Sequence, residues 1–167
     1  MATKNVYRAV IATPLGRIGI HMAGGAVSTL DYLPADMPEQ TPTDAATRTV
    51  VEQLEAYFRD PHRRFTVPLM LAGSVFQRRV WSALQTIPAG TALTYGELAR
   101  QLDTAARAVG GACRSNPIPI LVPCHRVVAR QGLGGYAGEV GGDSLGIKRW
   151  LLQHEGVEVE REHRKPA

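Results

Sequence analysis

The chain lacks several features that would assign it to a familiar class. No apolar run approaches the roughly 20 residues that cross a bilayer, and "MATKNVYRAV" at the N-terminus lacks the apolar stretch of a secretory signal, so we expect a cytoplasmic protein. Only two cysteines are present, and in a reducing compartment we expect no structural disulfide between them. No cysteines and histidines cluster at metal-site spacing, so we expect neither a metal nor a cofactor.

Charged residues are few, and the basic ones are unevenly distributed. The chain has 167 residues, 44% of them hydrophobic and 20% charged, which suits one globular domain or two small ones sharing a core. Residues 1–73 hold seven basic and seven acidic residues, whereas residues 74–135 hold seven arginines against two acidic residues, a net charge of +5. Arginine suits phosphate contacts, although a solvated basic face would have the same composition.

The first part of the chain predicts a small α/β domain over residues 1–73. Residues 5–33 contain three short β-type runs, separated at Pro14 to Gly16 and at Gly24-Gly25. The apolar residues of the segment 41–60 then recur at helical spacing, at Val50, Val51, Leu54, Tyr57 and Phe58. We therefore expect a small antiparallel sheet with one helix.

Residues 74–160 predict a second, mostly α-helical domain, preceded by a linker near 68–73. Ser74 is placed to cap a helix. The apolar face of that helix is formed by Phe76, Val80, Trp81, Leu84 and Ile87. A last helix over 144–156 ends at Gly156, and we expect the tail over 161–167 to be frayed.

Between these helices lie two shorter ones joined by a tight turn. Thr94 and Glu97 have the spacing of a capping box that begins a helix at Tyr95. Thr104 is expected to cap the next helix, over 105–115. Two short helices in this order indicate a helix-turn-helix, and we expect the domain to be a winged-helix-like DNA-binding domain.

The second helix of this pair has unusually small residues. Each glycine inside a helix costs about 1 kcal/mol relative to alanine. The small residues are Ala105, Ala106, Ala108, Gly110, Gly111 and Ala112. Such a helix is useful where its backbone must lie close to another helix or to a nucleic-acid groove, with Arg107 and Arg114 beside it. Both interpretations stay open on spacing alone.

Cys124 lies between a proline and His125, at the end of the apolar run "ILVPC". A buried cysteine is most often inert packing, and an apolar site raises the pKa of its thiol. A reactive role needs a base, for which His125 is placed, and a carboxylate to orient that base. Glu155 is one of several candidate carboxylates. These residues alone favour packing.

The neighbouring motifs favour reactivity instead. The segment "VPCHRVV" is preceded by "AARAVGGACR" and "SNPIPIL" and followed by "GGYAG" and "KRWLLQHEG". Together these motifs closely resemble the O6-alkylguanine-DNA alkyltransferases. The resemblance is specific over 76–156 and looser over 1–73, where "TPLGRIGI" and "LEAYF" are similar to the N-terminal domain of that family.

The resemblance implies a repair protein that acts once on double-stranded DNA carrying O6-alkylguanine, with O6-methylguanine as the expected lesion. Cys124 would accept the alkyl group irreversibly, and a water and His125 would link its thiol to Glu155. Asn116 would brace the turn before the active-site segment. Tyr95 would donate to the guanine ring and rotate its phosphate outward. We expect a monomer, and cooperative assembly along DNA stays open.

The resemblance also implies base flipping, because O6 lies on the base-pairing edge of guanine. Arg107 would fill the vacated place in the stack, and the small-residue helix would dock in the minor groove. Further DNA contacts are expected at Ala106, Gly110, Gly111, Arg114 and Ser115. The substrate pocket is expected to be lined by Cys113, Pro119, Val127, Tyr136, Ala137 and Gly138.

Two segments depart from the family pattern. The turn between Tyr95 and Arg107 is about two residues shorter than usual, and the segment between Tyr136 and Lys148 is longer.

Three other functions compete with alkyl transfer. A lesion-binding relative without transfer activity would lack Cys124. A winged-helix regulator would have no use for Cys124 and His125. A Cys-His hydrolase would need an oxyanion hole, for which the sequence has no signature.

Overall fold

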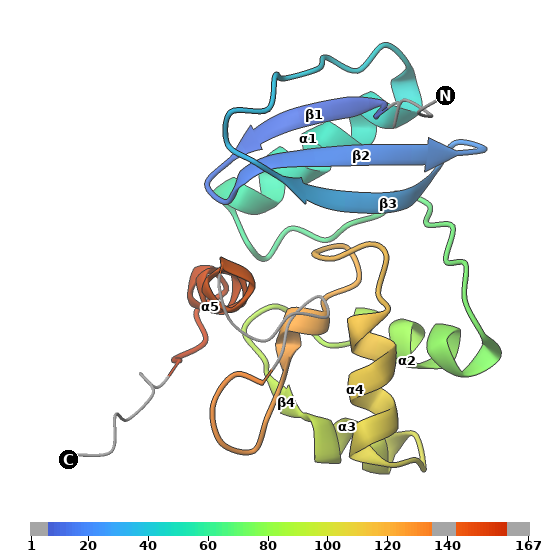
Figure 1. The fold of residues 1–167 in the computed structure, drawn as a ribbon, viewed down its shortest axis with the longest axis vertical. Helices are drawn as coiled ribbons and strands as arrows, with labels where there is room; N and C mark the ends of the chain where they lie inside the picture. The colour runs from blue at the N-terminus through green and yellow to red at the C-terminus, as the bar shows by residue number, and fades with distance from the viewer. Residues whose placement is uncertain (1–6, 135–142, 160–167) are drawn as a thin grey trace. The chain divides into compact units, whose positions relative to one another are not determined.

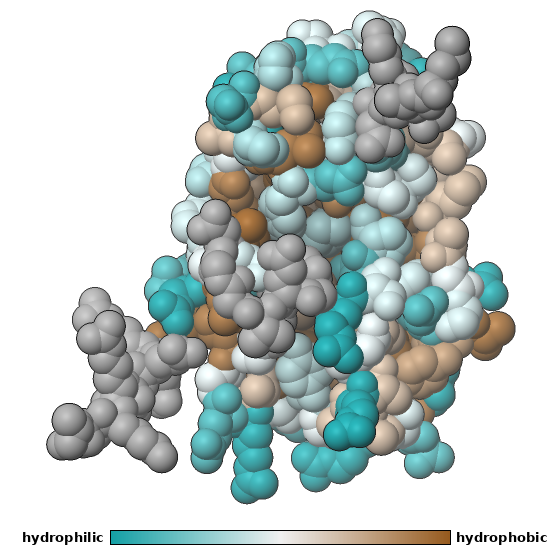
Figure 2. Space-filling model, in the orientation of Figure 1, coloured by the Kyte–Doolittle hydropathy of each residue, from teal (hydrophilic) through white to brown (hydrophobic). Residues whose placement is uncertain are grey.

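The computed structural model describes residues 7–134 and 143–159 and divides the chain into two compact units, Met1–Ala72 and Gly73–Ala167 (Figure 1). Tyr136, Ala137 and Gly138 lie outside the described residues, as does the tail over 161–167. Figure 2 shows hydrophilic residues spread over the visible surface of both units, with hydrophobic residues in small patches between them. In the part of the chain that is described, no helix is long and apolar enough to span a bilayer.

The first unit contains a three-stranded antiparallel sheet of order β1-β2-β3, formed by Ala9–Thr13, Gly16–Ala23 and Ala26–Leu33. The turns fall where the sequence predicts them. Gly24 and Gly25 connect β2 and β3 with φ angles of 58° and 78°, a conformation that glycine adopts without steric cost. The expected antiparallel sheet is therefore confirmed.

Helix α1 spans Ala45–Arg59 and lies along one face of this sheet (Figure 1). It begins at Asp44, whose side chain accepts a hydrogen bond of 2.8 Å from the backbone N–H of Thr47. Four of the five predicted apolar residues are buried: Val50, Val51, Leu54 and Tyr57. Phe58 is only half-buried and makes an edge contact with the ring of Tyr57.

In the second unit, helix α2 spans Val75–Gln85 and begins with a capping box between Ser74 and Gln77. Val80, Trp81 and Leu84 are buried, as predicted. Two members of the expected apolar face differ, because Phe76 is only half-buried and Ile87 lies beyond the end of the helix, although it is buried. The predicted cap at Ser74 is therefore confirmed, and the expected apolar face is confirmed only in part.

Helices α3 (Tyr95–Gln101) and α4 (Ala106–Arg114) follow, and α3 begins with the predicted capping box of Thr94 and Glu97. The prediction that Thr104 caps α4 is wrong. The backbone N–H of Thr104 closes the end of α3 by donating to the carbonyl of Ala99 at 2.9 Å. The residue preceding α4 is Ala105, and its side chain makes no capping hydrogen bond.

The last elements bring the cysteine segment beside α3. A 3-10 turn spans Cys124–Arg126, and strand β5 (Val127–Val128) pairs in parallel with β4 (Leu93–Thr94). The sequence did not predict this pairing. Helix α5 spans Asp143–His154. Gly156, two residues further on, has a φ of 83°, which confirms the predicted stop at this glycine.

Candidate active site

The backbone before Cys124 makes two sharp turns. The N–H of Leu121 donates to the carbonyl of Pro119 at 2.9 Å around Ile120, whose φ is 73°. The N–H of Cys124 then donates to the carbonyl of Val122 at 2.8 Å. A β-branched residue at positive φ is strained by about 1–3 kcal/mol and persists only where its surroundings hold it. The segment that presents Cys124 is therefore fixed by its neighbours.

Asn116 supplies much of that support. Its Nδ2 atom donates to the carbonyl of Val122 at 2.8 Å, and its Oδ1 accepts from the N–H of Ile118 at 2.9 Å. One side chain thus connects the end of α4 to the residues immediately before Cys124. Bracing of the turn by Asn116 stays a prediction, and these two hydrogen bonds join the segments that it concerns.

Cys124 itself is only 4% exposed. Burial raises the pKa of its thiol, while a hydrogen bond from the Asn116 side chain and the positive charge of Lys148 act in the opposite direction. Because the pKa lies above its ordinary value of 9.0, the resting residue is a protonated thiol at neutral pH. Reaction as a nucleophile therefore needs a group that removes the proton.

The adjacent histidine is part of a buried charged network. His125 Nε2 lies 2.7 Å from Glu155 Oε2, and Arg126 donates to both carboxylate oxygens at 2.8 and 2.9 Å. Arg126 also donates to the carbonyl of Ile87 at 2.6 Å. Although burial alone would raise it, hydrogen bonds from His125 and Arg126 lower the pKa of Glu155 to about 2. Glu155 is therefore a carboxylate at any physiological pH.

This carboxylate determines the protonation of the histidine. An ionised carboxylate only accepts hydrogen bonds, so we infer that His125 Nε2 carries the proton and that Nδ1 carries a lone pair. Burial lowers the pKa of His125, which keeps the ring neutral. Nδ1 is buried and has no hydrogen-bond partner among the described residues. His125 is thus a neutral base with one unused acceptor atom, one residue from the thiol.

Lys148 is a site residue that the sequence analysis missed. It is fully buried on α5, and its Nζ donates to the carbonyl of Val127 at 2.7 Å. The same Nζ lies 5.6 Å from the centre of the Tyr95 ring. Burial lowers its pKa to about 8. The available signal was its position on the apolar face of the helix, one turn before Leu151 and Leu152.

Tyr95 and Cys113 face the same cluster. Tyr95 is the first residue of α3, and burial raises the pKa of its hydroxyl, with further contributions from Cys113 and Cys124. Burial also raises the pKa of Cys113 to about 12, which leaves this second thiol unreactive. The expected wall residues Pro119 and Val127 are buried as well. Three of the six expected pocket residues are thus buried in the second unit, and Cys113 and Val127 belong to the cluster around Tyr95 and Lys148.

Helix α4 has an inner and an outer face. Val109, Ala112 and Cys113 are buried, and Trp81 Nε1 donates to the carbonyl of Ala112 at 2.8 Å. The outer side exposes Ala106, Arg107, Arg114 and Ser115.

The small residues of α4 allow close approach either by another helix or by a nucleic acid, and Gly110 and Gly111 help to distinguish the two. A β-carbon at Gly110 or Gly111 would meet no described atom within 4 Å outside the adjoining turns of α4. No neighbouring helix in the described structure therefore requires glycine at these positions. This observation favours close approach by something outside the chain.

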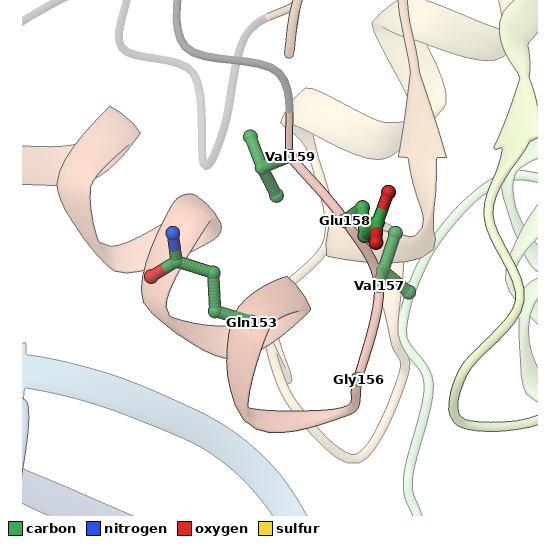
Figure 3. Close-up of a pocket in the computed structure, with 5 residues that line it drawn as sticks. All are labelled: Gln153, Gly156, Val157, Glu158 and Val159. Carbon is green, nitrogen blue, oxygen red and sulfur yellow. The ribbon is translucent and has the colours of Figure 1, made fainter.

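The structure also has an open pocket that contains none of the predicted site residues. The open pocket drawn in Figure 3 lies where α5 ends and is lined by Gln153, Gly156, Val157, Glu158 and Val159, none of which is a predicted site residue. Over residues 7–134 and 143–159, no three histidine, cysteine or acidic side chains group to hold a metal ion.

Comparisons with known proteins identify the family. Residues 75–157 match the family model described as 6-O-methylguanine DNA methyltransferase, DNA binding domain. The methylated-DNA–protein-cysteine methyltransferase of Shigella flexneri is 54% identical over 94 residues, which cover 54% of this chain and 52% of that protein. The protein of the same name from Mycobacterium bovis is 40% identical over 157 residues, 90% of this chain and 92% of that one.

A solved structure agrees over most of the chain. The crystal structure of Mycobacterium tuberculosis OGT in complex with DNA is 42% identical, with a TM-score of 0.75 over 87% of this chain and 90% of that one. The resemblance predicted from the motifs around Cys124 is confirmed, and the chain belongs to the methylated-DNA–protein-cysteine methyltransferase family.

Proposed function

We propose that the protein repairs DNA by transferring the alkyl group of an O6-alkylguanine, methyl above all, to Sγ of Cys124. The sulfur attacks the alkyl carbon, so that the carbon–sulfur bond forms as the bond from that carbon to O6 breaks. The thiol proton leaves the sulfur, and the departing guanine is protonated in turn. The product is a thioether, which is no longer a nucleophile, so each molecule acts once.

The observation that carries this proposal is the buried network beside Cys124. A thiol whose pKa is raised by burial needs an adjacent base, and His125 Nδ1 is a buried acceptor with no partner among the described residues. Nδ1 accepts the thiol proton through a water molecule, and Glu155 stabilises the imidazolium that forms. Arg126 keeps Glu155 ionised throughout.

The guanine is held by the cluster around Tyr95. The Tyr95 hydroxyl stays protonated because burial raises its pKa, so it can donate to the leaving guanine ring. Cys113, Pro119 and Val127 wall the pocket on the described side. Tyr136, Ala137 and Gly138 remain predicted wall residues.

DNA binds to the outer face of α4. Residues 74–160 form the catalytic and DNA-binding domain, in which α3, the turn at 102–105 and α4 are a helix-turn-helix within a winged-helix-like arrangement. Gly110 and Gly111 let the backbone approach the minor groove, and Arg114 and Ser115 contact its edge. Arg107, exposed in the first turn of α4, fills the place of the flipped guanine. The protein acts as a monomer in the cytoplasm, on nucleoid DNA if it is bacterial.

A titration tests this function. The protein is mixed with an excess of duplex carrying one labelled O6-methylguanine, and methyl groups transferred per protein molecule are counted over time. We expect a plateau at one. The Cys124→Ser variant should bind the duplex and accept nothing, because a serine hydroxyl is far harder to deprotonate. Sustained turnover would identify a different enzyme, and binding without any transfer by the wild-type protein would identify a lesion sensor.

A further inference from the structure

The turn between α3 and α4 holds a strained residue. Asp103 has φ of 53°, in the left-handed region that non-glycine residues rarely adopt. Two backbone bonds close the turn: Thr104 N–H to Ala99 at 2.9 Å and Asp103 N–H to Arg100 at 3.3 Å. This pattern usually has glycine at the position of Asp103, so the turn needs support from elsewhere to persist.

No side-chain cap fixes where helix α4 begins. The residue before its first turn is Ala105, which makes no side-chain capping bond. Its inner face is held near its C-terminal end, where Trp81 donates to the carbonyl of Ala112. In its first turn Ala106 and Arg107 are exposed and Val109 is fully buried, so the position of Arg107 depends on the packing of Val109 and on the turn at 102–105.

Arg79 supplies the missing support. This exposed arginine of α2 donates from Nη2 to the carbonyl of Leu102, the residue that ends α3. A carbonyl at this position has no partner inside its helix, and a guanidinium is favourable at the negative end of the helix dipole. Helix α2 thus contacts α4 directly through Trp81 near its C-terminal end, and it contacts the residue that opens the turn before α4 through Arg79.

We propose that Arg79 is a positioning residue for repair in duplex DNA: by fixing the turn at 102–105, it places Arg107 in the base stack. This proposal rests on the role of Arg107 proposed above. Arg79 touches neither the lesion nor the thiol. Its loss therefore affects the step that needs the duplex and spares the chemistry at Cys124.

The test compares Arg79→Ala with Arg78→Ala, which removes the same charge from the adjacent exposed position of the same helix. Rates of alkyl transfer are measured with O6-methylguanine duplex and with the free base O6-benzylguanine. We expect Arg79→Ala to slow duplex repair about tenfold or more, because small displacements of positioned groups are costly. The free-base rate of both variants should stay within about twofold of the wild-type rate, and Arg78→Ala should repair duplex at a similarly unchanged rate.

A second comparison separates positioning from phosphate contact. If Arg79 acts through Arg107, the Arg79→Ala change has little further effect in an Arg107→Ala background, whereas an independent phosphate contact would add its own loss. If Arg79 contacted a phosphate, its loss in Arg79→Ala would also make the dependence of DNA affinity on salt shallower than in Arg78→Ala, by about one unit of slope. Either of these results would overturn the positioning role.

The remaining outcomes are also decisive. Equal duplex rates for Arg79→Ala and Arg78→Ala would overturn the proposal. Arg79→Met, which keeps the aliphatic stem, is measured beside Arg79→Ala, and an equal loss on duplex and on free base in Arg79→Met would likewise overturn it. Failure of the proposed function itself would differ from all of these, because the wild-type protein would then transfer no alkyl group to Cys124.

Discussion

His125 Nε2 lies 2.7 Å from Glu155 Oε2, and neither side chain is exposed to solvent. The two residues are separated by 30 positions in the sequence, and Arg126 completes the network on the other carboxylate oxygen at 2.8 Å. This relationship fixes the tautomer of the histidine and connects the segment around Cys124 to the residue that follows α5. The same network therefore stabilises the second unit and prepares His125 to act as the base.

Glu155→Gln should destabilise the protein by about 3–5 kcal/mol at neutral pH, because it leaves the buried Arg126 without its charged partner. The folded-state pKa of Glu155 is depressed from 4.5 to about 2, so its contribution is fully present above pH 4.5 and is lost as the pH falls towards 2. Urea unfolding across this range should show a steeper loss of stability for the wild-type protein than for the variant. If the unfolding free energies of both proteins fell in parallel with pH, Glu155 would not have the depressed pKa.

His125→Ala should change how the chemical step depends on pH. Burial lowers the pKa of His125 below 6.5 and raises that of Cys124 above 9.0, so the wild-type rate with free O6-benzylguanine should be flat from about pH 6.5 to 7, above which Lys148, with a pKa of about 8, begins to lose its charge. In the variant the rate should be about a hundredfold lower at pH 7 and should rise with pH. A flat profile in the variant would show that His125 is not the base.

Arg107→Ala should affect one substrate and spare the other. Filling the vacated stack offsets an unstacking cost of a few kcal/mol, so repair of duplex DNA should slow by about tenfold or more. Reaction with the free base needs no flipping and should keep its rate. If both rates fell equally, Arg107 would act in folding or in the chemical step.

Asp103→Gly should stabilise the protein by about 0.5–1 kcal/mol. Glycine adopts the φ of 53° without steric cost, and the change removes a negative charge from the C-terminal end of α3. Thermal unfolding of this variant and of Asp103→Ala, which keeps the steric cost, checks the cause. A higher melting temperature for the alanine variant than for the glycine variant would contradict it.

Local patterns predicted much of this fold. The strand breaks, the capping box of Thr94 and Glu97 and the stop at Gly156 depend on neighbouring residues, and all three are confirmed. The role of Thr104 was mispredicted because a helix cap and the closing turn of the preceding helix compete for the same residue. The pairing of β4 with β5 involves only two residues of each strand, too short for a periodic signal.

Fewer features of the candidate site could be predicted from the sequence. Nothing local to Cys124 distinguishes Glu155 from the other acidic residues, and only the family resemblance singled it out. Its contact with His125 depends on how α5 packs against the cysteine segment, which is a tertiary property. Lys148 reads as an ordinary charged residue until the burial of its helix face is known. The open space around Gly110 and Gly111 is likewise visible only in the folded chain.

The position of the transferred methyl group decides whether Cys124 is the acceptor. After reaction with O6-methylguanine duplex, trypsin cleaves at Arg114 and Arg126 and releases Cys113 and Cys124 on separate peptides, which mass spectrometry distinguishes. We predict one methyl group on the Cys124 peptide, none on the Cys113 peptide, and the same result for a Cys113→Ser variant. A methyl group on Cys113, or on neither cysteine, would show that Cys124 is not the acceptor.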